Sequence, residues 1–197
     1  MLENPLKELI QELTILPGIG PKSAEKLAFF FLSITKNDVQ KFCSILSKTR
    51  ENIRYCELCF NISFSNVCSI CQDAERDKHQ LCIVAEPKDI YALEKTKYPG
   101  LYHVLGGLIS PIDGIHPEVL RIKELEQRLK KEPIKEIILA INSSIEGETT
   151  ILYLVKFLEQ FQIPLTRLAH GLPMGADIEY IDEITLGKAF QGRVKIS

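Results

Sequence analysis

The sequence predicts an α+β protein of several domains: a helical N-terminal region, a four-cysteine metal-binding segment and a C-terminal α/β domain with a parallel sheet. Apolar residues recur at helical spacing through the first part of the chain, and two Cys-x-x-Cys pairs follow. Beyond them, short apolar runs alternate with helical stretches, a pattern typical of parallel βαβ units. We therefore expect domains at residues 1–55, 56–71 and 79–175, with a C-terminal helix and tail at 176–197.

Composition and charge are those of an ordinary globular protein, with 45% hydrophobic and 25% charged residues. The net charge is −2, but residues 1–55 carry +2 and the remainder −4, which favours a polyanion at the N-terminal end. No signal peptide, transit peptide or membrane-spanning run is evident, so we expect a cytoplasmic location. The six cysteines fit a reducing compartment, and Cys43 and Cys82 are predicted to be small core residues.

Three helices are predicted in the N-terminal region. The first covers Pro5–Thr14, and the second continues through the apolar run Phe29–Leu32, which we expect in a core or a subunit contact. The third runs from Val39 to about residue 54, with Asn37 or Asp38 as its N-cap. Its apolar residues are expected to face inward: Val39, Phe42, Cys43, Ile45 and Leu46.

A glycine-rich turn, Gly18-Ile19-Gly20, separates the first two helices and is followed by Lys22 and Lys26, one helical turn apart. Glycines let a backbone approach a phosphate closely, and the free N–H groups of the next helix start point at the anion. The pattern resembles the helix-hairpin-helix motif, which implies DNA backbone binding by these five residues without sequence readout. The alternative is an ordinary turn between helices with two surface lysines.

Four cysteines, Cys56, Cys59, Cys68 and Cys71, form two Cys-x-x-Cys pairs at short separation. This spacing places four thiolates within reach of one tetrahedral zinc ion, the ligand set of closed structural sites. The intervening loop has too little apolar material for a core, so we expect one structural Zn²⁺ per chain to stabilise the segment. Disulfides and free core cysteines are the alternatives.

The C-terminal part predicts strands that alternate with helices, and therefore a parallel sheet with its working site at the strand carboxyl ends. The expected strands are residues 81–85, 101–105, 136–141 and 165–169. The expected helices are residues 87–97, 117–131, 146–161 and 179–190. Glu86 and Asn142 follow the first and third of these strands directly.

The polar residues at these strand ends resemble the Toprim domain of topoisomerases, primases and related nucleases. Glu86 matches the first acid of the catalytic members, but their Asp-x-Asp pair falls on Asn142 and Ser144. Mg²⁺ needs charged oxygen ligands, and Glu146 and Glu148 on the next helix replace the pair poorly. We therefore expect a catalytically silent site that is reused for binding, unless these glutamates only complement a helix N-terminus.

The order of the three regions resembles the RecR family of bacterial recombination mediators over essentially the whole chain. The stretches that carry the resemblance are Leu16–Ala28, Cys56–Cys71, Val104–Gly114, Glu146–Glu148 and Thr166–Gly175. The resemblance implies a non-enzymatic DNA-repair factor that acts with RecO and RecF. Such factors help to load the RecA recombinase onto single-stranded DNA coated with single-strand-binding protein.

The resemblance also implies assembly into a ring-shaped tetramer that encircles single- or double-stranded DNA near the bacterial nucleoid. Lys22 and Lys26 would face the DNA, and Glu86, Asn142 and Glu146 would meet RecO. No Gly-x-x-x-x-Gly-Lys-Ser/Thr loop is present, so no ATP hydrolysis is expected. Two other hypotheses remain: a Mg²⁺-dependent Toprim nuclease or primase-like enzyme, and a scaffold whose hairpin is only a turn.

Overall fold

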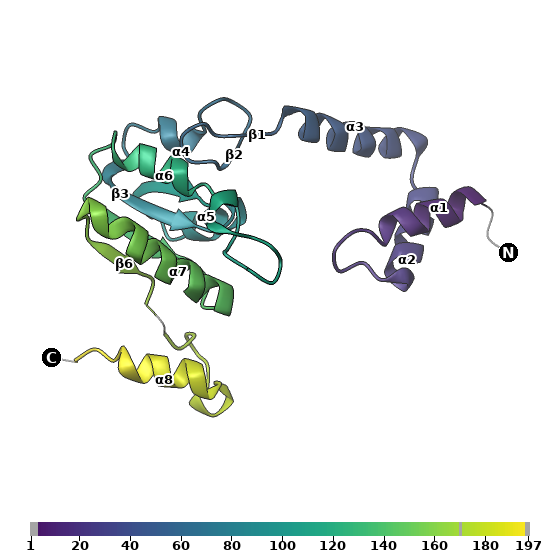
Figure 1. Ribbon diagram of the computed structural model, residues 1–197. Coiled ribbons are helices and arrows are strands. Elements are labelled where there is room, and N and C mark those ends of the chain that lie inside the picture. The colour runs from purple at the N-terminus through teal and green to yellow at the C-terminus, as the bar shows by residue number, and fades with distance from the viewer. Residues whose placement is uncertain (1–3, 170, 196–197) are drawn as a thin grey trace. The chain divides into compact units, whose positions relative to one another are not determined.

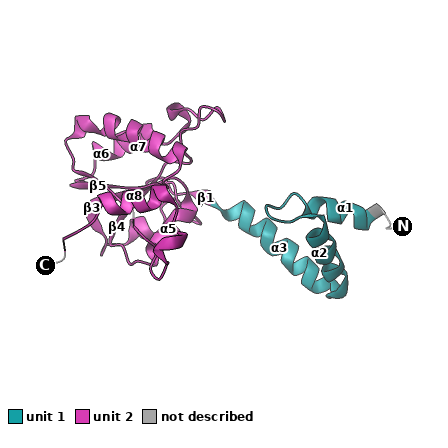
Figure 2. Cartoon of the chain, turned by 90° about the horizontal axis from the view of Figure 1, so that it is seen from below, with its two compact units in different colours: residues 1–53 teal, residues 54–197 magenta. Residues whose placement is uncertain are grey.

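The computed structural model describes residues 4–169 and 171–195, and it divides the chain into two compact units (Figures 1 and 2). Unit 1 is residues 1–53 and unit 2 is residues 54–197. The cysteine segment therefore belongs to unit 2. None of the helices in the described ranges is long and apolar enough to cross a membrane.

Unit 1 consists of three helices, α1 (Asn4–Leu13), α2 (Pro21–Ser33) and α3 (Lys36–Asn52). Helix α2 begins with Pro21, which has no backbone N–H. This costs no hydrogen bond, because the first N–H groups of a helix have no partner within the helix. The expected N-cap of the third helix was wrong, because the hydroxyl of Thr35 accepts the hydrogen bond from the backbone N–H of Asp38. A threonine here satisfies a free donor of the first turn.

The apolar face of α3 is exposed, contrary to the prediction for this helix. Phe42, Ile45 and Leu46 are 53–62% exposed, and Cys43 is exposed as well. The physical reason is that little of the described chain packs on α3. The ring of Phe42 on α3 contacts the ring of Phe31 on α2, with 5.5 Å between the ring centroids. Cys82, by contrast, is buried as predicted.

The cysteine segment contains short elements that the sequence pattern did not predict. Strand β1 (Arg54–Tyr55) pairs antiparallel with β2 (Ile62–Ser63), and a single helical turn, α4 (Ser69–Gln72), follows. The two short strands bring the first Cys-x-x-Cys pair into a tight loop.

The remainder of unit 2 is built on a four-stranded parallel sheet with strand order β4-β3-β5-β6. Its strands are β3 (Asp77–Val84), β4 (Gly100–Val104), β5 (Glu136–Ala140) and β6 (Leu165–Arg167). Val84 is level with Val104 on one side and Ala140 on the other. The segments that follow these three residues therefore meet at the carboxyl ends of the strands.

Helices α6 and α7 cover one face of the sheet and α5 the other, whereas α8 lies apart from the sheet; a 3₁₀ turn comes before α6, after α7 and before α8 (Figure 1). They are α5 (Pro87–Glu94), α6 (Ile122–Leu129), α7 (Ile145–Leu158) and α8 (Glu183–Gln191), and the turns are Pro117–Val119, Glu159–Phe161 and Ile178–Tyr180. The single helix predicted at residues 117–131 is wrong. Leu120 is extended, and the backbone N–H of Arg121 donates to the carbonyl of Leu105, which ties the chain to the end of β4.

Alternate residues of β3 face two different cores. Leu81 and Ile83 pack with α6 and α7, whereas Cys82 and Val84 pack with α5 and with Phe60 of the cysteine segment. Burial on both sides explains why this strand is a continuous apolar run. The predicted fold class, with its parallel α/β domain, is confirmed.

Candidate functional site

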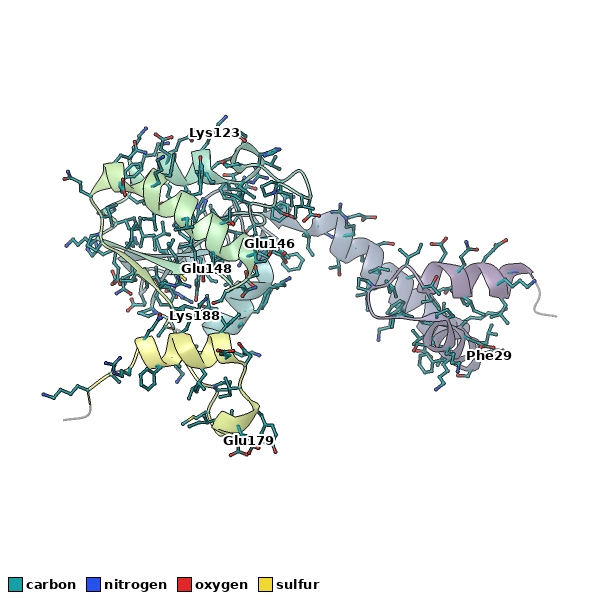
Figure 3. The ribbon with its side chains drawn as sticks, turned by 60° about the horizontal axis from the view of Figure 1, so that its bottom comes forward. Phe29, Lys123, Glu146, Glu148, Glu179 and Lys188 are labelled. Carbon is teal, nitrogen blue, oxygen red and sulfur yellow. The ribbon has the colours of Figure 1, made fainter. Side chains whose placement is uncertain are left out.

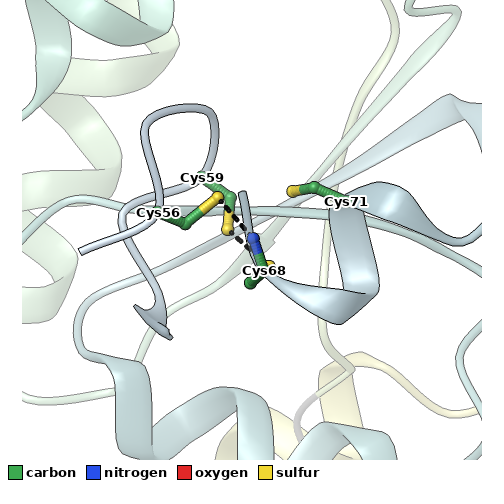
Figure 4. Close-up of side chains that lie close together, drawn as sticks. All are labelled: Cys56, Cys59, Cys68 and Cys71. Carbon is green, nitrogen blue, oxygen red and sulfur yellow. Dashed lines mark hydrogen bonds between the residues drawn. The ribbon is translucent and has the colours of Figure 1, made fainter. Parts of the chain in front are cut away.

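Four cysteine side chains converge in unit 2 and could hold one metal ion. The Sγ atoms of Cys56, Cys59, Cys68 and Cys71 all lie within 4.8 Å of one another, and the first three residues are buried (Figure 4). None of them forms a disulfide, and the Sγ atoms of Cys59 and Cys68 are 3.5 Å apart. This spacing is close to the edge of a tetrahedron with sulfur about 2.3 Å from a central ion.

The electrostatics of this cluster favour a cation. The hydrogen bond with Cys68 raises the pKa of the Cys59 thiol, and the thiols of Cys59 and Cys68 raise the pKa of Cys71. The same hydrogen bonds, with Cys59 and Cys71, lower the pKa of Cys68. In the metal-free cluster Cys68 is therefore the favoured thiolate, and Cys59 and Cys71 stay protonated, because crowded thiolates repel one another. A divalent metal ion would reverse the effect and stabilise all four thiolates together.

The metal-binding loop is joined to the edge of the sheet. The carbonyl oxygen of Cys59 accepts a 2.9 Å hydrogen bond from the backbone N–H of Val104 on β4. Phe60, the next residue, has a left-handed φ of 62°, which is rare for a bulky side chain. Its ring meets His103 edge-on at 5.6 Å and lies under the guanidinium of Arg121, 5.0 Å from the ring centroid.

The glycine turn of unit 1 has the geometry of an anion-binding helix start. Gly18 has a φ of +80°, which favours glycine, and the exposed Gly20 caps α2 with no side chain. Nothing lies within 4 Å of a side chain placed at either glycine, so a ligand could approach the backbone. Lys22 and Lys26 are exposed on the first turns of α2, and Ile19 is half-buried.

At the carboxyl ends of the strands, two positions that match the acidic site of catalytic Toprim domains, Glu86 and Ser144, serve as helix caps. The Glu86 carboxylate accepts from the backbone of Asp89 at the start of α5, and it pairs with Lys88 Nζ at 2.7 Å. The Ser144 hydroxyl accepts from Gly147 N at the start of α7. Asn142 is exposed just before this cap, and a Cβ at Gly147 would lie 1.9 Å from its carbonyl oxygen, so only glycine fits there.

Glu148 is neutralised by two cations from distant parts of the chain. Its carboxylate accepts from both Nη atoms of Arg167, at the end of β6, at 2.9 and 3.2 Å. Lys188 of α8 contributes a third bond at 3.2 Å, and Figure 3 shows its side chain beside Glu148. Chiefly through Arg167, these contacts lower the pKa of Glu148 to about 2. Glu146, two residues earlier on α7, is half-buried.

Three regions of the chain match known families. Residues 6–49 match the helix-hairpin-helix region of RecR, residues 79–169 the Toprim domain, and residues 171–194 the C-terminal region of RecR. The chain is 49% identical to the Recombination protein RecR of Leifsonia xyli subsp. xyli over 198 residues, covering all of both chains. It is 50% identical to the Recombination protein RecR of Clavibacter michiganensis subsp. michiganensis over 194 residues, 98% of each chain.

The chain belongs to the RecR family. The predicted resemblance is thereby confirmed, together with the helix-hairpin-helix and Toprim assignments. Within this RecR-family chain, the structure brings the four cysteines together, and it places the glycine turn and both lysines on one helix start.

Sequence reasoning missed the residues that complete these sites. Arg167 and Lys188 are 19 and 40 residues from Glu148, so no local spacing links them to it. The stacked pair of Phe60 and Arg121 was missed for the same reason.

Proposed function

We propose that this RecR-family chain is a non-catalytic mediator of recombinational DNA repair. It binds the backbone of single- and double-stranded DNA without sequence preference. It acts with RecO and RecF to help load RecA onto DNA coated with single-strand-binding protein, in the bacterial cytoplasm at the nucleoid. The observation that carries the proposal is the open hairpin of Gly18-Ile19-Gly20 beside Lys22 and Lys26, in a chain related to recombination proteins over its whole length.

The hairpin suits a phosphate for two reasons. Pro21 has no N–H, and the N–H groups of Ser23 and Ala24 donate to the Gly20 carbonyl, so Lys22 supplies the free backbone N–H at the start of α2. This end of the helix carries partial positive charge, and Gly20 adds no capping side chain to cover it. Lys22 and Lys26 add two full charges on the same helix start. Contacts of this type fix the DNA backbone and read no base.

The sheet end supports a binding role and gives little support to the Mg²⁺-dependent enzyme. Asn142 and Ser144 carry no negative charge, and the charge of Glu148 is balanced by Arg167 and Lys188. A divalent ion would find only Glu86 and Glu146 as further acids from the predicted site, and Glu86 already pairs with Lys88. We propose that Glu86, Asn142 and Glu146 instead contact RecO.

The four cysteines are proposed to hold one structural Zn²⁺. Four sulfur ligands, three of them in buried residues, suit zinc in a closed structural site better than a catalytic metal. The ion would stabilise the loop that joins β4 and would take no part in chemistry.

Self-assembly into a ring-shaped tetramer is supported by the exposed apolar face of unit 1. Six large apolar side chains of α2 and α3 are 48–64% exposed: Phe29, Phe30, Leu32, Phe42, Ile45 and Leu46. Large apolar side chains left exposed in this number are typical of protein interfaces. Several copies in a ring would multiply weak DNA contacts through their high effective concentration.

Fluorescence anisotropy on a labelled duplex and a labelled single strand, at several salt concentrations, tests the proposal. The variant Lys22→Glu, Lys26→Glu should bind both DNAs more weakly and with a shallower salt dependence, by about one unit of slope per lost phosphate contact. The control is Lys41→Glu, Lys48→Glu, which makes the same charge change at exposed positions of α3. Zinc content and oligomeric mass are measured on each protein.

If both variants bind as the wild type does, the hairpin is not the DNA contact and the proposal is wrong. Cleavage of DNA in Mg²⁺ or Mn²⁺ that disappears in Glu86→Ala would refute the non-catalytic assignment.

A further inference from the structure

A cleft of about 350 Å³ lies within unit 2, at the carboxyl ends of β3 and β4. Its walls come from the cysteine segment, the two strand ends and the start of α6. They include Tyr55, Phe60, Glu86, Gly106, Val119 and Arg121. Ligands of open α/β sheets bind outside the carboxyl ends of the strands, where this cleft lies. Asn142 and Glu146 do not line this cleft, so it differs from the partner face proposed above and shares only Glu86 with it.

The cleft presents flat surfaces suited to stacking. The Arg121 guanidinium lies 5.0 Å from the centroid of the Phe60 ring, and the Tyr55 side chain is 61% exposed. Phe60 is held in a left-handed conformation by the cysteine loop, where its N–H donates to the Cys56 carbonyl at 2.9 Å. Strained residues of this kind cluster at functional sites. Aromatic rings and guanidinium planes are the surfaces on which unpaired bases stack.

The polar groups and the charge around the cleft favour a base over a phosphate as its ligand. The Glu86 carboxylate can accept a hydrogen bond from a base amino group, whereas it would repel a phosphate. The part of the chain beyond residue 55 carries a net charge of −4, which also disfavours a backbone contact. The bases of a duplex are already stacked and paired, so a duplex cannot fill the cleft without opening.

We infer that this cleft binds an unpaired base of single-stranded DNA, with Tyr55 and the Phe60–Arg121 pair as stacking surfaces. The inference rests on the proposed DNA-binding function and adds a second, separate contact to it. The hairpin holds the backbone of either DNA form, and the cleft adds affinity for single strands only. Because stacking displaces few counterions, this added affinity depends little on salt.

The test is the same anisotropy titration with Tyr55→Ala, Tyr55→Phe and Tyr91→Ala. Tyr91 is a matched control, since it is 62% exposed on α5 and does not line the cleft. Tyr55→Ala should bind the single strand about 5- to 150-fold more weakly at every salt concentration, the size of one lost base stack, with duplex binding unchanged. Tyr55→Phe keeps the ring and should bind as the wild type does, as should Tyr91→Ala. Zinc content confirms that each variant retains its cysteine loop.

The inference is wrong if Tyr55→Ala binds the single strand like the wild type, or if its duplex binding falls equally. It is also wrong if Tyr91→Ala shows the same loss. If Tyr55→Ala binds DNA normally and the Lys22→Glu, Lys26→Glu variant binds it weakly, the cleft inference is refuted and the hairpin proposal stands. A loss confined to Tyr55→Ala, with the hairpin variant normal, would support the cleft and refute the hairpin.

Discussion

The two units of this chain differ in how much of their apolar surface they bury. In unit 2, a parallel sheet is buried on both faces by helices and by the cysteine segment. In the described part of unit 1, only Ala24 and Ala28 are buried, while large side chains of α2 and α3 remain exposed. A unit of about 50 residues with so small a core is marginal by itself. Unit 2 therefore contains its own stabilising interactions, whereas unit 1 needs another surface to cover its apolar side chains.

Metal removal should have the largest effect, and it should act on unit 2. Structural zinc binds with an apparent free energy of roughly 10–16 kcal/mol in zinc-finger peptides, and we expect a segment with so little core to need such energy from the proposed ion in order to fold. We expect chelation, or Cys68→Ser, to release the ion and to lower the unfolding temperature of unit 2. Zinc content and thermal unfolding measure this. Cys43→Ser changes an exposed cysteine outside the cluster and should change neither.

A melting curve that stays the same after complete loss of the ion would show that the loop folds without metal.

A matched pair of leucines tests the difference between the units directly. Leu154 is fully buried against the sheet, and Leu46 is 62% exposed on α3. Leu154→Ala should lower the free energy of unfolding by about 2–5 kcal/mol. Leu46→Ala should change it by less than about 0.5 kcal/mol but weaken the proposed self-association. Denaturant unfolding and sedimentation measure the two effects. An equal fall in the free energy of unfolding in both variants would contradict the proposed difference between the units.

Lowering the pH should destabilise unit 2 through His103. Burial lowers the pKa of this side chain to about 4, from its ordinary value of 6.5. Its Nε2 donates to the Arg121 carbonyl, and the buried Nδ1 has no partner. The unfolded chain takes up a proton near pH 6.5 and the folded chain only near pH 4, so stability falls as the pH drops through this interval. The loss is at most about 3 kcal/mol, and His103→Gln should remove most of it.

Urea midpoints measured across this interval test the assignment to His103. His116→Gln is the control, because this histidine is exposed. If His103→Gln keeps the pH dependence of the wild type, another group is responsible.

The smallest effect is expected where α8 meets α7. Lys188→Ala removes one bond to Glu148, and the pair is about one-third exposed on each side. Such pairs contribute about 0–1 kcal/mol, so global unfolding should hardly change. Hydrogen exchange in α8 should nevertheless become faster, as it should for the wild type at high salt. Lys156→Ala on α7 is the control, and equal exchange in both variants would show that Lys188 does not hold α8.

The sequence pattern was sufficient for the features that depend on local order. The apolar runs marked the strands, and the cysteine spacing marked the cluster, because both signals lie within a few neighbouring residues. The break before α6 could not be read in this way, since it depends on the hydrogen bond from Arg121 to the Leu105 carbonyl. The exposure of α3 was also invisible, because periodicity shows which face is apolar but not whether anything covers it. The balanced charge of Glu148 needed tertiary contacts with Arg167 and Lys188.

The hydrogen bond from Val104 to the Cys59 carbonyl has a consequence for the metal-free protein. Strand β4 lies at the margin of the sheet, and this bond covers part of its outer side. An uncovered outer strand is a template on which other chains can pair, and this leads to aggregation. With zinc as the proposed ion, zinc starvation would therefore reduce the amount of soluble protein in the cell as well as its stability. Precipitate formed after chelation should contain intermolecular β-structure that begins at β4.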